Sequence, residues 1–385
     1  MSGKVDVVVG LQFGSEGKGR FAAELAAPYE LTKTPYAAAV RAGGPNAGHT
    51  LFVRDQPLVV RHLPAAVVNP NTELFIGPGA ALDLDVLEQE LLACEAVGLS
   101  VRDRLMIDPQ CVIVTEQDRE FEHEVTQRIG STGKGGGSAW IRKASRTWTG
   151  PVTAWDHGKG ELFTTSFLLR HMERVIPRLH SIIGRGANVL AEGTQGALLS
   201  LDVSYHWPHV TAKNVTATAL LGELGLSCRD VRDVYGVART FPIRVGGPSG
   251  AMGEELDWPT VLANLPGYEP ERTTVTGRQR RIAKFDRDAF VYAARMNGCT
   301  GLCFSFLDYL DPLLAGRDAR TLDELMGLSP TAEAWCACRA VEAQAPLVGA
   351  SWGPDANQTV VDRTMTLAGS PFTIPWPPTP NTANA

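Results

Sequence analysis

The sequence predicts an α/β protein with a large, mostly parallel central sheet and helices on both of its faces. Two observations carry this prediction. Short apolar runs rich in β-branched residues alternate along the chain with segments whose apolar residues recur at helical spacing. Glycine-rich segments follow several of these runs, and in parallel sheets such loops gather at the carboxyl ends of the strands, where ligands bind.

Each expected element follows from a local pattern. Short apolar runs predict strands over residues 5–9, 37–40, 59–63, 74–76, 112–115, 188–191, 231–237 and 302–306. Apolar residues at helical spacing predict helices over residues 21–27, 83–97 and 167–183. Asp83 stands where its side chain can cap the second helix. A run of glycines predicts a loop over residues 131–138.

Composition narrows the classes of function. The chain has 385 residues and a net charge of −6, so it has no overall basic field with which to hold nucleic acid. No apolar stretch reaches the roughly 18 residues of a membrane-spanning helix. A strand is expected almost at the N-terminus, and the seven cysteines are scattered, which favours reduced thiols in a cytoplasm. We expect one catalytic domain over residues 1–370 and a proline-rich tail over 371–385.

Residues 10–20 form the most informative segment. They read Gly-Leu-Gln-Phe-Gly-Ser-Glu-Gly-Lys-Gly-Arg and follow the first expected strand directly. Glycines let the backbone approach a phosphate, and Lys18 supplies positive charge. The standard P-loop has a glycine where Gln12 stands and a serine or threonine where Gly19 stands. An unrelated P-loop GTPase or kinase is therefore disfavoured.

Two further segments carry residue types suited to chemistry on a nucleotide. His49 follows an expected strand within Asn-Ala-Gly-His-Thr, and a histidine can protonate an oxyanion at neutral pH, although a lone histidine is often structural. Arg278, Arg280 and Arg281 follow a Thr/Gly turn, where arginines can bind a carboxylate with two parallel hydrogen bonds. The alternative is a solvated surface charge run.

These segments, together with Glu-Gly-Thr-Gln-Gly at 192–196, Ser-Phe-Leu-Asp at 305–308 and Ser-Trp-Gly-Pro-Asp at 351–355, resemble the motifs of adenylosuccinate synthetases, in the same order along the chain. The resemblance runs from residue 5 to about residue 366. It implies the fold of that family, with a P-loop-like nucleotide-binding loop, and a ligase that joins L-aspartate to the 6-position of a purine monophosphate. It also implies a nucleoside triphosphate as energy source, Mg²⁺ as cofactor and a 6-phosphoryl intermediate.

The resemblance implies four groups of site residues. Catalytic roles fall to Ser15, Lys18, His49 and Gln195, and the magnesium ligands are Ser15 and Gly48. The triphosphate site comprises Gly14, Glu16, Gly17, Lys18, Gly19, Gly48, His49, Thr50, Arg280, Phe306, Asp308, Ser351, Gly353 and Pro354. The purine monophosphate site comprises Ser15, Asn46, Ser131, Thr132, Arg146, Gln195, Thr211 and Val245. The aspartate site comprises Thr274, Val275, Thr276 and Arg278.

By the same resemblance Arg146 reaches the phosphate of a neighbouring subunit, which implies a homodimer. Asp202, His206 and His209 suggest a metal site from their types alone, but the matching stretch of the family binds no metal.

Several positions depart from the family pattern. Ser15 stands in place of the aspartate that takes the purine N1 proton, and Phe306 replaces a lysine of the guanine pocket. Lys134 replaces an arginine, Val275 replaces a threonine, and the segment between Arg146 and Gln195 is shorter than in typical bacterial members.

These departures resemble the phage-type aminoadenylosuccinate synthases, which act on dGMP in making 2-aminoadenine for modified DNA and would work in a host cytoplasm. A small serine also leaves room for a 2-amino group. The sequence therefore favours dGMP over IMP, with ATP or dATP at least as good as GTP. An ordinary GTP-dependent synthetase acting on IMP and a catalytically weak nucleotide-binding homologue remain the alternatives.

Overall fold

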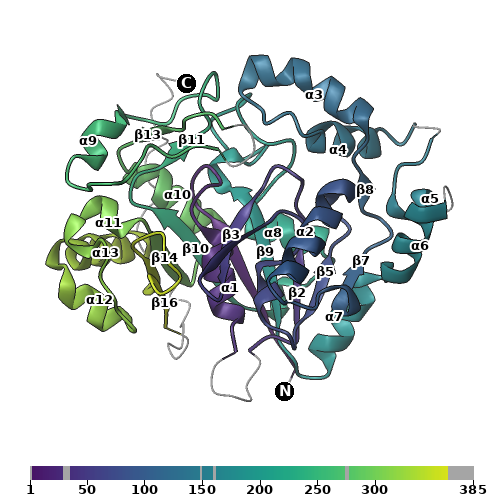
Figure 1. Cartoon of the computed structure of the whole chain (residues 1–385), viewed down its shortest axis with the longest axis horizontal. Coiled ribbons are helices and arrows are strands. Elements are labelled where there is room, and N and C mark those ends of the chain that lie inside the picture. The colour runs from purple at the N-terminus through teal and green to yellow at the C-terminus, as the bar shows by residue number, and fades with distance from the viewer. Residues whose placement is uncertain (1, 29–34, 148–149, 159–161, 274–276, 363–385) are drawn as a thin grey trace.

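The computed structural model describes residues 2–28, 35–147, 150–158, 162–273 and 277–362. Its centre is a nine-stranded sheet in the order β16-β15-β14-β10-β1-β9-β2-β5-β7, in which every neighbouring pair is parallel except β15 and β16 (Figure 1). The expected mostly parallel sheet is confirmed. Within the described residues, no helix has the length and apolar character needed to cross a membrane.

The strands of the large sheet are β1 Val5–Gly10, β2 Ala38–Arg41, β5 Glu73–Ile76, β7 Leu105–Ile107, β9 Val189–Gly196, β10 Val231–Arg239, β14 Gly301–Ser305, β15 Leu347–Ser351 and β16 Thr359–Val361. Three smaller pairings add β3 His49–Val53 with β4 Gln56–Val60, β6 Ala81–Leu82 with β8 Val112–Ile113, and the antiparallel set β11 Ile243–Arg244, β13 Arg281–Ala283 and β12 Glu255–Leu256.

The α-helices are α1 Lys18–Ala26, α2 Leu84–Ala96, α3 Glu116–Ile129, α4 Gly136–Ser145, α5 Ala154–His157, α6 Leu162–His171, α7 Val175–Gly184, α8 Ala217–Glu223, α9 Trp258–Leu262, α10 Arg287–Asn297, α11 Leu307–Leu310, α12 Leu322–Leu328 and α13 Pro330–Ala343. Short 3₁₀ turns are η1 Ala65–Val68, η2 Arg102–Arg104, η3 Ala197–Leu199, η4 Cys228–Asp230 and η5 Pro312–Leu314.

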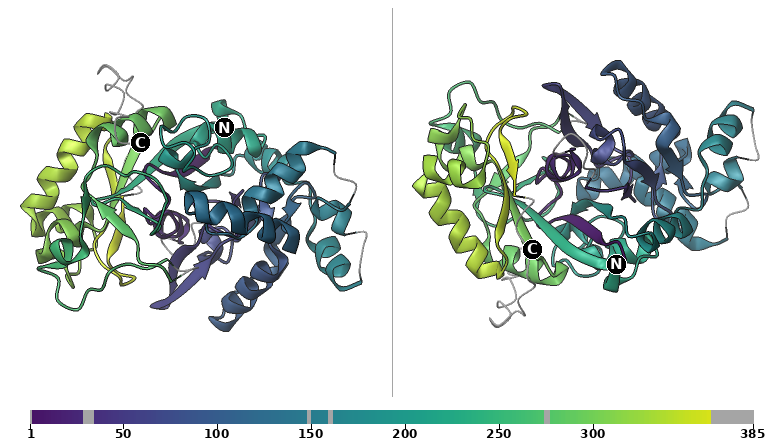
Figure 2. Two further views of the ribbon diagram at one scale, coloured as in Figure 1. Left: turned by 90° about the horizontal axis from the view of Figure 1, so that it is seen from above. Right: turned by 90° about the horizontal axis from the view of Figure 1, so that it is seen from below.

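Helices cover both faces of the sheet. Along the fully buried β1, Val7 and Val9 pack into a core with α7, α8, α10 and α13, whereas Val8 packs into a second core with α1, α2 and η1. Alternate side chains of a strand point to opposite faces, so a β1 with buried valines on both faces requires a layer on each side. The architecture is therefore three-layered, as Figure 2 shows from two directions.

The structure corrects three sequence-based expectations. The helix expected over 167–183 is two helices, because Glu173 donates to the carbonyl of Ile107 in β7 and the Asp108 carboxylate accepts from the Val175 N–H, 3.0 Å away, at the start of α7. The strand expected over 59–63 lies earlier, as β4, because a turn at Arg54 and Asp55 closes a hairpin with β3.

The third correction concerns the glycine-rich loop expected over 131–138. Residues 131–135 are loop, but Gly136–Ser138 already belong to α4. The Glu122 carboxylate accepts hydrogen bonds from the backbone N–H groups of Gly135, Gly137 and Ser138. This carboxylate satisfies the free N–H groups of the first turn and so starts the helix. In α2, by contrast, Asp83 caps the helix as expected.

Loops that follow the strands gather at one edge of the large sheet. In Figure 1 this is the upper edge, where α3, α4, α9 and the sheet of β11 and β13 lie, opposite to the N-terminus. Loops after β1, β2, β9, β10 and β14 therefore converge there, which fits the rule that open parallel sheets bind ligands at the carboxyl ends of their strands.

Candidate active site

The loop between β1 and α1 folds around the Glu16 carboxylate. Its Oε1 accepts from the N–H groups of Gln12 and Gly14, at 3.0 and 2.7 Å, and its Oε2 lies 2.7 Å from Lys18 Nζ. Lys18 also donates to the Gly14 carbonyl, 3.0 Å away. Gly14 and Gly17 have φ of 98° and 86°, a left-handed conformation that favours glycine. Glu16 therefore shapes the loop from inside rather than lining a cavity.

Two cavities open on either side of this loop. The first has a volume of about 580 Å³ and the second about 250 Å³. Gly14, Ser15, Gly48 and Arg280 line both. A ligand in one cavity can therefore meet a ligand in the other at Ser15, which is the arrangement that a reaction between two bound nucleotides requires.

The first cavity brings together nearly the whole predicted triphosphate site. Of the predicted residues, all except Glu16 line it: Gly14, Gly17, Lys18, Gly19, Gly48, His49, Thr50, Arg280, Phe306, Asp308, Ser351, Gly353 and Pro354. The lining residues that sequence reasoning missed include Arg20, Tyr268, Glu271 and Tyr309. Arg20 lies two residues after the loop lysine, so its place in the first turn of α1 was the available signal.

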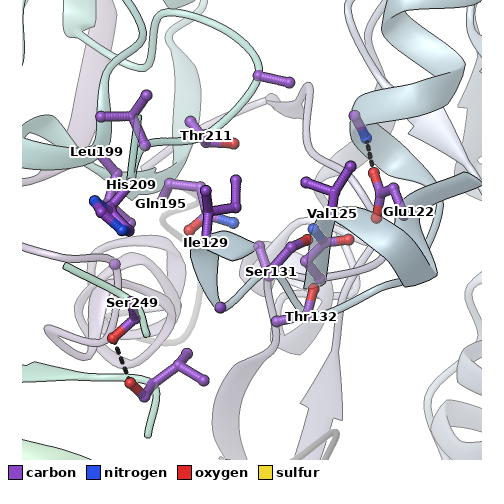
Figure 3. A pocket seen from close by; sticks show the side chains of 18 of the residues that line it. Glu122, Val125, Ile129, Ser131, Thr132, Gln195, Leu199, His209, Thr211 and Ser249 are labelled. Atoms are coloured by element: carbon purple, nitrogen blue, oxygen red, sulfur yellow. Dashed lines mark hydrogen bonds between the residues drawn. The ribbon is translucent and has the colours of Figure 1, made fainter. Parts of the chain in front are cut away.

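The second cavity collects the predicted purine monophosphate residues. Ser15, Asn46, Ser131, Thr132, Gln195, Thr211 and Val245 all line it, and Figure 3 shows Ser131, Thr132, Gln195 and Thr211 around the same space. The buried Thr132 Oγ1 and Asn46 Oδ1 have no hydrogen-bond partner among the described residues. Unpaired buried polar atoms are costly, so these two groups fit a site that a polar ligand completes.

Five further predicted residues lie outside the two cavities or outside the described part of the chain. Arg146 is exposed at the end of α4 and lines neither cavity of its own chain. Arg278 is exposed, its N–H donates to Thr273 Oγ1 at 3.1 Å, and it lines neither cavity. The predicted aspartate-site residues Thr274, Val275 and Thr276 lie outside the described residues.

His49 is the first residue of β3 and is held by a buried ionic cluster. Its Nδ1 contacts the Glu192 carboxylate, which also lies 3.3 Å from Arg41 and accepts from the Ala65 N–H at 2.6 Å. Its Nε2 is buried and has no partner within the described chain. Burial and the nearby Arg41 lower the pKa of His49 to about 4, and Glu192 opposes this shift. The imidazole is therefore neutral at pH 7 with no ligand bound.

Ser15, where the two cavities meet, is fixed by two arginines. Arg280 donates to the Ser15 hydroxyl at 2.8 Å, and Arg239 donates to the Ser15 carbonyl at 3.3 Å. Arg239 in turn pairs with Glu271 and covers the Phe306 ring, with its guanidinium carbon 3.7 Å from the ring centroid. Because the Arg280 guanidinium is only a donor, the Ser15 O–H remains free to donate to a ligand.

Hard oxygen atoms suited to Mg²⁺ occur at this junction. Ser15 offers a hydroxyl and Gly48 a carbonyl, both at the wall shared by the two cavities. Mg²⁺ typically combines one or two protein oxygens with substrate phosphates and water. These residues fit an ion brought by a triphosphate. Elsewhere in the described chain, no three His, Cys, Asp or Glu side chains cluster as a metal site, and Asp202 instead hydrogen-bonds to Asn214.

Comparisons with known proteins agree on one family. Residues 7–153 and 161–315 match the family model described as adenylosuccinate synthetase. The chain is 34% identical over 313 residues to an adenylosuccinate synthetase of Methanococcus maripaludis strain C5, covering 79% of this chain and 85% of the relative. It is 31% identical over 359 residues to the adenylosuccinate synthetase of Methanocaldococcus jannaschii, covering 92% and 95%.

Two solved structures resemble the fold. One is the cyanophage S-2L succinoaminodeoxyadenylate synthetase bound to dGMP and to dATP as an energy donor, with a TM-score of 0.74, 28% identity and coverage of 94% of this chain and 97% of that chain. The other is the fully ligated adenylosuccinate synthetase of Plasmodium falciparum, with a TM-score of 0.77, 21% identity and coverage of 93% and 100%. The second likeness concerns the fold alone.

Proposed function

Because this chain belongs to the adenylosuccinate synthetase family, we propose that it joins L-aspartate to the 6-position of dGMP, with ATP or dATP as energy donor and Mg²⁺ as cofactor. The product is N6-succino-2-amino-2′-deoxyadenylate. The reaction has two steps. The purine 6-oxygen attacks the γ-phosphate to form a 6-phosphoryl intermediate, and the amino group of aspartate then displaces phosphate.

The choice of dGMP as the substrate rests on Ser15. It lies on the wall shared by the two cavities, at the position where the family has a catalytic aspartate. Its hydroxyl is neutral and small, so it leaves space beside the purine for a 2-amino group. The likeness to the cyanophage enzyme, whose structure holds dGMP and dATP, supports the same reading.

The remaining catalytic roles follow from charge and position. Lys18 stabilises the negative charge of the transferring phosphoryl group, and Gln195 hydrogen-bonds the base near its 6-oxygen. A bound triphosphate brings several negative charges against His49 Nε2 and raises the pKa of His49, so that the protonated ring can donate to the developing oxyanion. Ser15 and Gly48, together with the triphosphate, would hold Mg²⁺, which would supply positive charge to neutralise the phosphates.

Aspartate and the substrate phosphate need charges from outside the two cavities. Arg278 anchors the aspartate carboxylate, helped by the segment over 274–276. Arg146 lies at the far end of α4, about 15 Å from Gly136 by the rise of a ten-residue helix. We place Arg146 in the active site of a second copy of the chain, so the working unit is a homodimer.

The second candidate is an ordinary synthetase that converts IMP with GTP. Asp308 favours it, because an ionised carboxylate can accept from the N1 and N2 donors of guanine. Incubating the protein with aspartate, Mg²⁺ and either ATP or GTP, with IMP, GMP and dGMP as acceptors, separates the two. We expect dGMP to gain the mass of aspartate less water, and turnover of IMP without turnover of dGMP would contradict the proposal.

A further inference from the structure

A buried carboxylate on α2, outside both cavities, binds the segment that follows β4. Glu90 is 5% exposed, and its Oε1 accepts from the backbone N–H groups of Arg61 and His62, at 2.8 and 3.2 Å. Its Oε2 accepts from the N–H groups of His62 and Leu63, at 3.0 and 3.1 Å. Three consecutive backbone N–H groups therefore share one carboxylate.

The same segment also binds the ionic cluster behind His49. The Leu63 carbonyl accepts from Arg41 Nη1 at 3.4 Å, and the Ala65 N–H donates to Glu192 Oε2 at 2.6 Å. Arg41 Nη1 lies 3.3 Å from Glu192 Oε1, and this same oxygen contacts His49 Nδ1. The segment therefore links the carboxylate of α2 to the imidazole through direct contacts.

These contacts lie behind the reacting group and not in a ligand site. His49 lines the first cavity, and its buried Nε2 has no partner within the described chain. The segment over 61–65, which the structure describes in full, lines neither cavity, and neither does Glu90. A ring that is held at Nδ1 presents Nε2 in a fixed orientation, and catalysis depends steeply on such orientation. Contacts behind the ring can therefore affect the rate without touching a ligand.

We infer that Glu90 is a positioning residue for His49. It fixes the segment over 61–65, and this segment holds Arg41 and Glu192 against the imidazole. A carboxylate suits this place because each of its two oxygens accepts from two N–H groups, whereas a glutamine has one acceptor oxygen and an NH₂ group that would face N–H donors. The inference rests on the proposed function only for the role of His49 as general acid, and not for the choice of dGMP or ATP.

The test is a double-mutant cycle on kcat, measured on the full chain with saturating substrates and with whichever of dGMP, GMP or IMP the protein converts. Glu90→Gln alone should lower kcat about tenfold, while the ATP dissociation constant, measured by calorimetry, changes by less than about threefold. In the His49→Asn background, Glu90→Gln should change kcat by less than about twofold, because the ring that it positions is gone. Burial raises the pKa of Glu90 to about 7, so the assays are run at about pH 8, where this carboxylate is ionised.

Asp108→Asn is the matched control. Asp108 is also 5% exposed and accepts from backbone N–H groups, those of Gln110 and Val175 at 2.8 and 3.0 Å, but it lines neither cavity. Its effect on kcat should be the same in the wild type and in His49→Asn. Glu90→Asp keeps a carboxylate, so it should retain more activity than Glu90→Gln, and it takes the place of Glu90→Gln in the cycle if that variant fails to fold.

The possible results separate the inference from the proposed function. A loss of kcat confined to the chain that has His49 supports the inference. Equal losses from Glu90→Gln in both backgrounds would show a role in the fold alone and overturn it, as would an unchanged kcat in Glu90→Gln or a matching loss of ATP affinity. An unchanged kcat in His49→Asn would contradict the general-acid role in the proposed function itself, whatever the effect of Glu90→Gln.

Discussion

The two cavities at the sheet edge differ in how much of their chemistry one chain supplies. The first contains Lys18, Arg20 and Arg280, and its lysine is oriented by Glu16 inside a loop of fixed geometry. Among the described residues that line the second, the lysine and arginine side chains are Arg244 and Arg280. Arg280 is bonded to Ser15, and Arg244 donates to the carbonyls of His209 and Ala251 at 2.7 and 2.8 Å.

The phosphate end of the second cavity is therefore short of positive charge. Ser131, Thr132 and Thr211 provide hydroxyls there, and Glu122 places a carboxylate at the start of α4. A phosphate dianion in such a site needs charge-assisted hydrogen bonds. If the proposed function holds, one chain supplies the cations of the first cavity, whereas the second cavity needs a cation from a second copy of the chain. The predictions below test each side of this contrast.

The largest expected effect is on kcat, and it concerns His49 in the first cavity. His49→Asn keeps a polar side chain but removes the proton donor, so we expect kcat to fall by about 10²–10⁴-fold with little change in nucleotide binding. Steady-state kinetics with dGMP, together with ATP binding by calorimetry, measure the two quantities separately. A loss of kcat below threefold would refute the assignment of His49 as the general acid.

The next effect concerns Ser15, where the cavities meet. Ser15→Asp restores the residue of the family and places a carboxylate beside Arg280. We expect the ratio of kcat/KM for dGMP to that for IMP to fall about a hundredfold, because the added group takes the space for the 2-amino group and can accept the N1 proton of IMP. Ser15→Ala is the control for loss of the hydroxyl alone. An unchanged ratio in Ser15→Asp would remove Ser15 from substrate choice.

The next prediction concerns the second cavity and the KM for the monophosphate, and its expected effect is smaller. Arg146→Ala should raise the KM for the monophosphate about tenfold or more, which is about 1.4 kcal/mol per decade. Lys143, on the same helix, donates to the Pro78 carbonyl at 3.1 Å, so Lys143→Ala is a matched loss of one charge outside the cavities.

Mixing subunits then tests whether Arg146 acts across a dimer. Lys18→Ala subunits combined with Arg146→Ala subunits should regain part of the activity, because one site of the hybrid keeps both side chains. A mixture that stays as inactive as its parents, despite demonstrated subunit exchange, would show that Arg146 does not act in trans.

The sequence predicted the strands and the ligand loops better than the contacts that hold them. β1, β2, β5, β10 and β14 were expected because a buried parallel strand is apolar along its own length, and the site loops because glycines and charged residues are adjacent in the chain. The contact between His49 and Glu192 joins residues 143 positions apart, and that between Arg239 and Ser15 joins residues 224 apart. No local pattern encodes such pairs.

The same limit explains the errors at helix ends. The break before α7 depends on Asp108, 67 positions away from Val175, and the early start of α4 depends on a carboxylate of α3. Apolar spacing continues through the break before α7, and the glycine run conceals the start of α4, because local patterns do not show where a distant side chain supplies a cap.

The smallest expected effect is on stability, and it concerns the buried cluster behind the first cavity. The pKa of His49 is about 4 in the folded chain, below its ordinary value of 6.5, because burial and Arg41 disfavour the charged ring. Between these two pH values the unfolded chain binds more protons than the folded chain, so the free energy of unfolding should rise with pH from about 4 to 6.5. For one such group the slope is on the order of 1 kcal/mol per pH unit.

In His49→Asn we expect a shallower slope in urea titrations across this window, and some slope should remain because burial also lowers the pKa of His62 to about 3 and of His206 to about 4. Equal slopes in the variant and the wild type would mean that His49 is charged in the folded chain, paired with Glu192 before any triphosphate arrives.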